Sequence, residues 1–253
     1  MTNDLSGKTA LVTGAASGIG AALVAQLTSQ GASVLAVDIQ NDALDALAEQ
    51  TGCLPYVADI TTEAANRAMV DAAVAALGPL DLMFLNAGVL GRSREEQGQP
   101  YQVGDLVLDQ YRKVMAVNTD SVIYGTVAAA PHMNDGGGII VTASAAGLVP
   151  WEPTPFYSAT KHAVVGWTRA VASSLAEQNV TINAVCPGGV ATALLGLTAD
   201  AAEAVPQLLD PAQVAEAAIT TALGGATGTA VSVVANRTPV AQTHKFNTIP
   251  NFP

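Results

Sequence analysis

Positively charged side chains are scarce in this sequence. Its 253 residues contain 10 Lys and Arg against 21 Asp and Glu, which gives a formal net charge of −11 at pH 7. Nucleic acids and anionic membranes are bound largely through Lys and Arg that neutralise phosphates, so we expect neither kind of partner. A phosphate group can still be held at one local site by backbone amides and a helix N-terminus.

Cysteines are few as well. Cys53 and Cys186 lie in apolar segments, which predicts two buried thiols rather than a disulfide or a metal pair. The three histidines, His132, His162 and His244, lack the spacing of metal ligands, so we expect no metal. These features favour a reducing, cytoplasmic compartment.

Membrane-length hydrophobic runs and flexible linkers are missing too. No apolar run approaches the roughly 20 residues that span a bilayer, and no basic segment followed by an apolar one opens the chain. No Pro-, Gly- or Ser-rich stretch divides the sequence, which predicts a single domain over residues 1–253. Half of the residues are hydrophobic, 12% are charged and 4% are aromatic. We therefore expect a soluble protein with a sizeable core and slim, Ala-rich helices.

Short apolar runs alternate with longer stretches of helical period, which is typical of βαβ units that build a parallel sheet. The apolar runs predict strands at 9–13, 33–37, 54–58, 80–85, 138–143, 181–185 and 229–234. The stretches between them predict helices at 19–30, 42–50, 63–77, 109–132, 156–178 and 211–223. The predicted fold class is α/β, with a doubly wound seven-stranded parallel sheet and helices on both faces. A surface loop is expected at 91–104 and an irregular tail at 236–253.

The first predicted strand runs directly into a glycine-rich turn. The turn and the start of the next helix comprise Thr13, Gly14, Ala15, Ala16, Ser17, Gly18, Ile19 and Gly20. Glycines let the chain turn sharply and let a pyrophosphate approach the backbone at the positive end of a helix. The spacing G-x-x-x-G-x-G differs from the G-x-G-x-x-G form. A tight turn alone needs only one or two glycines, so three at this spacing favour a dinucleotide site.

Two acidic residues close the next two strands. Asp38 ends the second strand, where a Rossmann unit places the carboxylate that accepts the hydroxyls of the adenosine ribose. This carboxylate would repel a 2′-phosphate, and no Arg or Lys occupies positions 15 to 17 or 39 to offset the repulsion. We therefore predict NAD rather than NADP. Asp59 ends the third strand and either hydrogen-bonds the adenine or caps the following helix.

Tyr157 and Lys161 are four residues apart in a predicted helix, so their side chains share one face. A free tyrosine has a pKa of about 10 and is a poor base near neutrality unless a positive charge stabilises the phenolate. Lys161 can supply that charge. The chain has only four lysines, which makes a chance pairing less common, although Y-x-x-x-K alone is a weak motif.

Other polar residues are expected at the same edge of the sheet. Ser144 follows one strand and the Asn86–Gly88 segment follows another, while Asn118 lies within a long predicted helix. Ligands of doubly wound folds bind at the carboxyl ends of the strands. The sequence thus predicts that these side chains converge with Tyr157 and Lys161.

Taken together, these motifs closely resemble the single-domain branch of the short-chain dehydrogenase/reductase family, which has a Rossmann fold. The residues that carry the resemblance are the Thr13–Gly20 motif, Asp59, Asn86, Ala87, Gly88, Asn118, Ser144, Tyr157, Lys161 and the segment from Pro187 to Thr192. It implies that Tyr157 is the general acid/base and that Ser144 orients the substrate oxygen. It also implies that Lys161 binds the nicotinamide ribose and lowers the tyrosine pKa, and that Asn118 holds a water molecule. The Val190 backbone and the Thr192 hydroxyl would bind the carboxamide.

The expected NAD-binding residues run along the whole cofactor. They are Gly14, Ser17, Gly18, Ile19, Gly20, Asp38, Asp59, Ile60, Asn86, Ala87, Gly88, Tyr157, Lys161, Pro187, Gly188, Val190 and Thr192. The substrate would contact Ser144 and Tyr157, beside a pocket formed by Ala145, Val149, Trp151, Phe156, Leu194 and Leu195. Each of these apolar residues could equally belong to the ordinary core.

The predicted activity is an NAD-dependent interconversion of a small or medium, mostly apolar secondary alcohol and its ketone. A catalytically silent NAD-binding sensor or scaffold is the alternative, because fold alone does not specify turnover. An epimerase or dehydratase is disfavoured by the glycine spacing, and carrier-protein-linked ketoreduction by the lack of a basic docking patch. We also predict a homo-oligomer, a tetramer by resemblance. Its tail would reach a neighbouring subunit through Phe246, Ile249 and Phe252.

Overall fold

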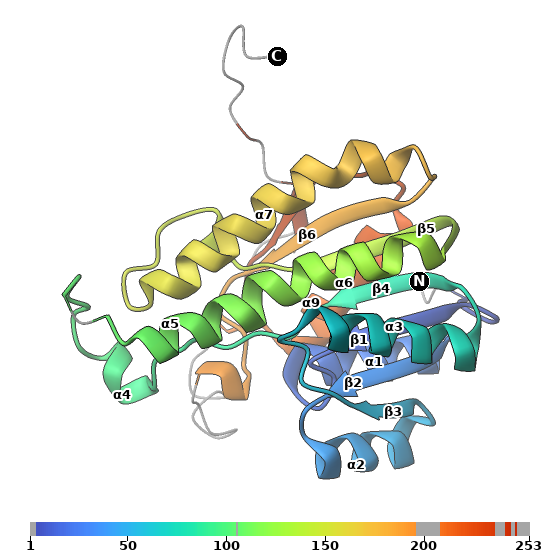
Figure 1. Ribbon diagram of the computed structural model, residues 1–253, viewed down its shortest axis with the longest axis horizontal. Coiled ribbons are helices and arrows are strands. Elements are labelled where there is room, and N and C mark those ends of the chain that lie inside the picture. Colours follow the sequence, from blue (N-terminus) through green and yellow to red (C-terminus); the bar gives the residue numbers. More distant parts are fainter. Residues whose placement is uncertain (1–3, 105, 196–207, 236–240, 244–245, 247–253) are drawn as a thin grey trace, which may run out of the picture.

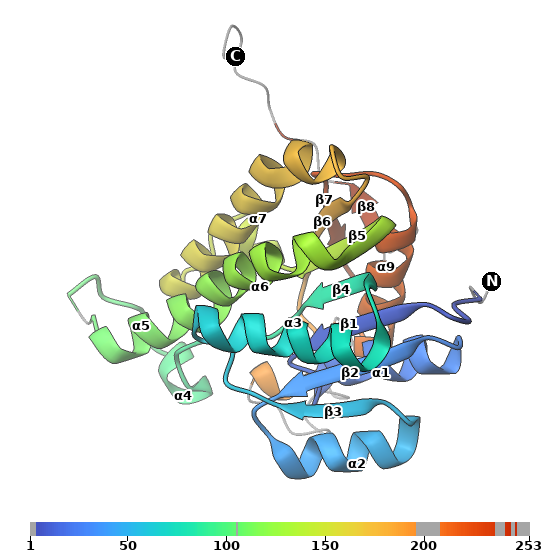
Figure 2. The same cartoon turned by 45° about the vertical axis from the view of Figure 1, so that its right-hand side comes forward.

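The computed structural model describes residues 4–104, 106–195, 208–235, 241–243 and 246. One sheet of eight strands, in the order β3-β2-β1-β4-β5-β6-β7-β8, forms the centre of the molecule. The strands are β1 (Thr9–Thr13), β2 (Ser33–Asp38), β3 (Leu54–Val57), β4 (Leu80–Leu85), β5 (Met133–Thr142), β6 (Thr181–Pro187), β7 (Ala230–Val233) and β8 (Ala241–Thr243). The first seven are parallel, and β8 pairs antiparallel with β7. The predicted seven-stranded parallel sheet, a Rossmann-like fold, is confirmed, with β8 as an added edge strand (Figure 2).

Helices cover both faces of the sheet, as Figure 1 shows. They are α1 (Gly18–Ser29), α2 (Asn41–Thr51), α3 (Glu63–Leu77), α4 (Arg94–Gln97), α5 (Leu108–Met115), α6 (Ser121–Ala129), α7 (Pro155–Ala176) and α9 (Pro211–Leu223). Short turns of 3-10 helix lie at Ala130–His132, Ala145–Gly147 and Ala193–Leu195. No helix in these described ranges has both the length and the apolar character needed to cross a bilayer.

Alternation along the strands builds two apolar layers. In β4, Phe84 faces the layer under α1, α2 and α9, whereas Met83 and Leu85 face the layer under α3, α6 and α7. Both faces are buried, which explains why the strands are continuous apolar runs in the sequence. Cys53 and Cys186 are buried free thiols, as predicted.

The predicted helix at 109–132 is wrong in its middle. A π-helical turn at Ala116–Asp120 separates α5 from α6. The sequence has no Gly or Pro between 116 and 120 that would predict an interruption of the helix. Its cause is tertiary, because Asn118 is drawn into bonds with the segment that follows β4, and π turns often mark such positions.

The tail and the loop also differ from the prediction of irregular structure. Ala241–Thr243 forms β8 along β7 of the same chain, and the loop at 91–104 contains the short helix α4. Phe246 lies over the guanidinium of Arg169 in α7, with 3.7 Å from Cζ to the ring centroid. These tail contacts are made within one chain, and Ile249 and Phe252 lie outside the described residues. Contact of the tail with a neighbouring subunit therefore stays a prediction.

Candidate active site

The glycine turn after β1 is shaped by close backbone approach. Gly14 has φ +66°, and a Cβ there would lie 2.7 Å from the Cα of Ala87. A Cβ on Gly20 would lie 1.9 Å from the carbonyl oxygen of Gly14, so the first turn of α1 folds directly onto the loop. Gly18 has φ +53° and sits against Thr192. The turn thus exposes backbone amides at the positive N-terminal end of α1.

Asp38 joins the end of β2 to this turn. Its carboxylate accepts hydrogen bonds from the backbone N–H of Ala16 at 3.0 Å, Ile39 at 2.7 Å and Gln40 at 3.1 Å. An ionised carboxylate has about four acceptor positions, which leaves room for a further donor. The side chain is therefore held in one place, half-buried, at the edge where the second strand ends.

The alternative role of Asp59 as a helix cap is wrong. Helix α3 is capped by Thr62, whose hydroxyl accepts from the N–H of Ala65 at 3.2 Å. The Asp59 carboxylate instead accepts from the N–H of Thr61 at 3.1 Å. Asp59 and Ile60 both line the cavity described below.

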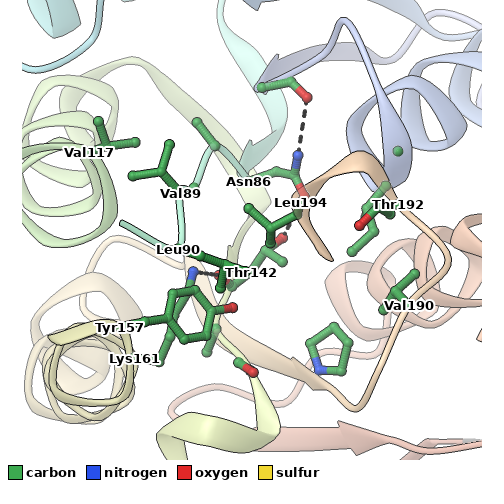
Figure 3. Close-up of a pocket in the computed structure, with 18 of the residues that line it drawn as sticks. Asn86, Val89, Leu90, Val117, Thr142, Tyr157, Lys161, Val190, Thr192 and Leu194 are labelled. Carbon is green, nitrogen blue, oxygen red and sulfur yellow. Dashed lines mark hydrogen bonds between the residues drawn. The ribbon is translucent and has the colours of Figure 1, made fainter. Parts of the chain in front are cut away.

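Asn86 ties three strand ends together. Its side-chain amide donates to the carbonyls of Thr13 at 3.1 Å and Gly14 at 3.3 Å, and its side-chain oxygen accepts from the hydroxyl of Thr142 at 3.0 Å (Figure 3). The hydroxyl of Thr13 in turn accepts from the N–H groups of Asn86 and Ala87. The amide of Asn86 thereby holds the glycine turn in register with β4 and β5.

Asn118 is fully buried in the π-helical turn. Its side chain pairs with the backbone of Val89, accepting from N–H and donating to C=O, both at 2.8 Å. It also donates to the hydroxyl of Thr160 at 3.2 Å. A Cβ on Gly88 would lie 3.4 Å from the side-chain oxygen of Asn118 and 3.6 Å from Nζ of Lys161. Asn118 and Lys161 thus both lie next to Gly88, although Asn118 is in a π-helical turn and not in the regular helix that the sequence predicted.

Tyr157 and Lys161 project from the first turns of α7 toward the end of β5 (Figure 3). They are 6% and 3% exposed, and Nζ of Lys161 lies 5.5 Å from the centre of the phenol ring. Nζ donates to the carbonyl of Thr142 at 2.7 Å. The predicted pairing of the two side chains is present, and both face the same strand end.

Burial dominates the electrostatics of this pair. It raises the pKa of Tyr157, and hydrogen bonding with Ser144 opposes that shift without reversing it. Burial also lowers the pKa of Lys161 to about 8. The thiol of Cys186 stays neutral nearby, because burial raises its pKa to about 12. The protein alone therefore holds the phenol protonated, whereas the resemblance implies a tyrosine with a lowered pKa.

Ser144 lies two residues beyond β5, where the 3-10 turn Ala145–Gly147 begins. Its hydroxyl accepts from the N–H of Ala146 at 3.1 Å. The turn presses against α7, since a Cβ on Gly147 would lie 2.6 Å from the carbonyl oxygen of Lys161. Ser158 secures the contact by donating to the carbonyl of Ala146 at 2.8 Å. This packing brings Ser144 to the phenol.

A cavity of about 870 Å³ connects these features. Of the predicted site residues, its lining contains Gly14, Ser17, Gly18, Ile19, Asp38, Asp59, Ile60, Asn86, Ala87, Gly88, Ser144, Tyr157, Lys161, Pro187, Gly188, Val190 and Thr192. Gly20 and Asn118 do not line the cavity, but they contact Gly14 and Val89, which do. The lining also contains five of the predicted apolar pocket residues, Ala145, Val149, Trp151, Leu194 and Leu195. Phe156 is a wrong prediction, because its ring packs against Tyr101 and Tyr111.

Comparison with known proteins identifies the family. A family model described as short chain dehydrogenase matches residues 8–202. The chain belongs to the short chain dehydrogenase family. It is therefore an oxidoreductase with a Rossmann-like fold, as the sequence motifs predicted.

Relatives of this short chain dehydrogenase include enzymes named for the alcohols they oxidise. 3beta-hydroxysteroid dehydrogenase 2 of Eggerthella lenta is 36% identical over 196 residues, 74% of this chain and 73% of that protein. Cyclohexanol dehydrogenase of Acinetobacter sp. is 35% identical over 202 residues, 77% and 78% of the two chains. The solved structure of 3-ketoacyl-(acyl-carrier-protein) reductase from Brucella melitensis, complexed with NADH, has a TM-score of 0.81 and 29% identity, covering 92% and 99%.

Several residues that build the site in this short chain dehydrogenase were missed in the sequence. Asn66, fully buried in α3, donates to the carbonyls of Ile60 at 2.7 Å and Thr62 at 2.8 Å and so fixes the segment after β3. Gly147 and Ser158 seat the Ser144 turn on α7. Ser158 contacts a residue that is distant in sequence, and Gly147 matters because it lacks a side chain. Neither kind of contact produces a local sequence pattern.

Proposed function

We propose that this short chain dehydrogenase is an NAD-dependent oxidoreductase that interconverts a secondary alcohol and a ketone, with Tyr157 as the general acid/base. The observation that carries the proposal is the convergence of Ser144, Tyr157 and Lys161 at one end of the cavity that begins at the glycine turn. The names of the alcohol dehydrogenases among its relatives support the reaction class.

The residues around the glycine turn fit a dinucleotide. Because Gly14 and Gly18 lack a Cβ, Ala87 and Thr192 pack directly against the turn beside the N-terminus of α1, where pyrophosphate oxygens can meet backbone N–H groups. The fixed carboxylate of Asp38 suits the two ribose hydroxyls of NAD and would repel the 2′-phosphate of NADP. Positions 15, 16, 17 and 39 carry no basic side chain to offset that repulsion. We therefore propose NAD as the cofactor, extending along the cavity past Asp59 and Asn86 to Val190 and Thr192.

In this proposal, side chains of the protein transfer the proton. When bound, the nicotinamide supplies the hydride acceptor or donor of the reaction. Ser144 donates a hydrogen bond that orients the substrate oxygen beside the phenol. Tyr157 takes the alcohol proton during oxidation and returns it during reduction. Lys161 contributes positive charge near the phenol and its ammonium group is held by the carbonyl of Thr142.

Without cofactor, Tyr157 is in the protonated form, which is the form that acts as the acid in reduction. Because burial raises the pKa of Tyr157, the phenol is protonated at neutral pH and is ready to act as an acid. Oxidation requires a phenolate, which the positive charge of Lys161 and of an oxidised nicotinamide both stabilise. Below about pH 8 Lys161 keeps its proton and supplies this charge.

The substrate end of the cavity is apolar. Leu90, Ala146 and Tyr157 form a buried cluster against which Trp151 and Leu195 pack. Such a lining suits an uncharged carbon skeleton with a single oxygen directed at Ser144 and Tyr157. We propose a small or medium, mostly apolar alcohol as the substrate.

The test is turnover by Tyr157→Phe, followed through nicotinamide absorbance with a panel of secondary alcohols and ketones. The parent should react with NAD in preference to NADP, and the variant should lose at least about a hundredfold in kcat, the usual contribution of a general acid/base. NAD titration of the variant should show that binding persists. Tyr56→Phe, in β3 and away from the cavity, is the matched control. Full turnover by Tyr157→Phe would refute the mechanism, and NAD binding by a parent that turns over no alcohol or ketone would favour a silent sensor.

A further inference from the structure

The polar loop at 91–104 is built around one guanidinium. It leaves β4 through Leu90 and turns at Gly91, which has φ +79° and presses on Val114 of α5. Short helix α4 is then capped reciprocally, since Ser93 N–H donates to the carboxylate of Glu96 at 2.6 Å and Glu96 N–H donates to the Ser93 hydroxyl at 3.2 Å. The loop is therefore a folded element beside α5 (Figure 1). Arg92 lies near its start, two residues before helix α4.

Arg92 connects this loop to a second segment. One arm of its guanidinium donates to the carbonyl of Pro153, just before α7, and the other arm donates to the carbonyls of Glu96 and, at 3.4 Å, Gln99. The guanidinium also lies 5.5 Å from the centre of the Tyr101 ring. A planar fork can satisfy acceptors on two sides at once, which a lysine ammonium on a flexible stem does less well.

Aromatic contacts continue the connection to α7. The ring of Phe156 meets Tyr101 edge-on at 5.5 Å and Tyr111 edge-on at 5.4 Å. Phe156 directly precedes Tyr157, so its anchoring fixes the start of the helix that carries the phenol. Arg92 therefore links the loop to the segment just before α7, and Phe156 links it to the first turn of α7.

The segments joined by Arg92 are the two walls of the substrate end. Leu90, two residues before Arg92, is 6% exposed and packs in the cluster with Tyr157. Trp151, two residues before Pro153, meets Tyr157 edge-on at 5.6 Å, and its backbone N–H donates to the hydroxyl of Ser158 at 3.3 Å. The separation of Leu90 and Trp151 thus depends on a bond made outside the cavity.

We propose that Arg92 is a positioning residue that determines substrate size by clamping the Leu90 wall to the Trp151 wall. This inference rests on the proposed function for the identity of the reaction, and the clamp itself can be measured without turnover. Arg92 does not contact the reacting atoms in this scheme. Its loss should widen the apolar end of the pocket and leave the cofactor end unchanged.

Two variants test the clamp by kinetics. Arg92→Ala removes the fork, and Arg92→Lys keeps the charge but cannot span both sets of carbonyls. Both should change the ratio of kcat/KM between a bulky and a small secondary alcohol by about tenfold, mainly through KM, since apolar pockets discriminate on this scale. KM for NAD should stay within about twofold in both. Arg112→Ala is the matched control, because this exposed arginine on α5 pairs only with Asp109 among the ion pairs of the described residues.

Fluorescence tests the clamp independently of activity. Trp151 and Trp167 are the two tryptophans of the chain, so Trp167→Phe leaves Trp151 as the single reporter. In that background Arg92→Ala should shift the Trp151 emission to the red and increase its quenching by acrylamide, while Arg112→Ala should change neither. Thermal melting followed by circular dichroism checks that each variant is folded. If Arg92→Ala does not fold, Arg92→Lys takes its place in the fluorescence test.

The outcomes separate the two proposals. An unchanged ratio of kcat/KM between the bulky and the small alcohol in both Arg92 variants overturns the specificity role, whatever the fluorescence does. Unchanged Trp151 emission and quenching overturn the clamp itself. If the parent turns over no alcohol, the proposed function fails, and the fluorescence result alone then decides whether Arg92 holds the two walls together.

Discussion

Lys161 is expected to destabilise the folded protein at neutral pH. Burial lowers its pKa from 10.5 to about 8, a change of roughly 2.5 units. At about 1.4 kcal/mol per unit, holding the buried ammonium costs about 3 kcal/mol below pH 8. Lys161→Met removes this cost but also loses the charged hydrogen bond to Thr142, which contributes about 2 kcal/mol. The variant should therefore be about 1 kcal/mol more stable than the parent at pH 7.

This stability difference should disappear at high pH. Between about pH 8 and 10.5 the unfolded chain keeps the proton on Lys161 while the folded chain releases it, so the unfolded state binds more protons. The free energy of unfolding of the parent consequently rises with pH across this window. By pH 10 the cost has fallen by about 2 kcal/mol or more, and the charged hydrogen bond is lost with the proton, so the stability advantage of Lys161→Met should disappear.

Urea unfolding at pH 7 and pH 10, followed by far-ultraviolet circular dichroism, measures the effect. The quantity of interest is the stability difference between parent and variant at each pH, since all other titrating groups are shared by both. Lys113→Met, at an exposed lysine on α5, is the control and should show the same difference at both pH values. A stability difference for Lys161→Met that does not change with pH would refute the assignment of a buried, desolvated ammonium.

Three further substitutions test the cofactor end. Asp38→Ala should reduce the preference for NAD over NADP by about tenfold or more, measured as the ratio of kcat/KM values, because a close negative charge is removed. Gly20→Ala should lower the free energy of unfolding by about 2 kcal/mol and abolish NAD binding, since its Cβ would lie 1.9 Å from the oxygen of Gly14. Gly166→Ala, with open space around it, should not destabilise. Asn66→Leu should weaken NAD binding and lower stability by about 1–3 kcal/mol by releasing two backbone carbonyls, which calorimetry and urea unfolding can check.

Elements that bury a continuous apolar run could be predicted from the sequence. The helices at 63–77 and 211–223 and the strands at 9–13 and 80–85 have the predicted bounds. The remaining parallel strands differ at one or both ends, most of all β5, which begins five residues earlier. Such segments can be recognised in the sequence because burial on both faces requires apolar residues throughout. β8 could not be predicted, since three residues of an antiparallel edge strand have no such requirement.

The candidate site divides in the same way. Glycines at 14, 18 and 20 and the pair Tyr157 and Lys161 are recognisable because backbone geometry or helical spacing demands them. Asn66 and Ser158 bind backbone carbonyls, and since every residue offers a carbonyl, the partner leaves no pattern. Phe156 could have been excluded: consecutive residues of a helix point about 100° apart, so it does not share the face of Tyr157.

The two ends of the cavity therefore differ in how they can vary. At the cofactor end, backbone atoms approach one another so closely that a single methyl group on Gly20 would collide with Gly14. At the substrate end, Arg92 holds backbone carbonyls of two loops, and those acceptors persist whatever side chains the loops carry. Side chains on these loops can then change while the clamp and the phenol stay in place. Under the proposed function and the proposed clamp, substitutions in the loop at 91–104 should therefore alter substrate preference without altering Ser144, Tyr157 or Lys161.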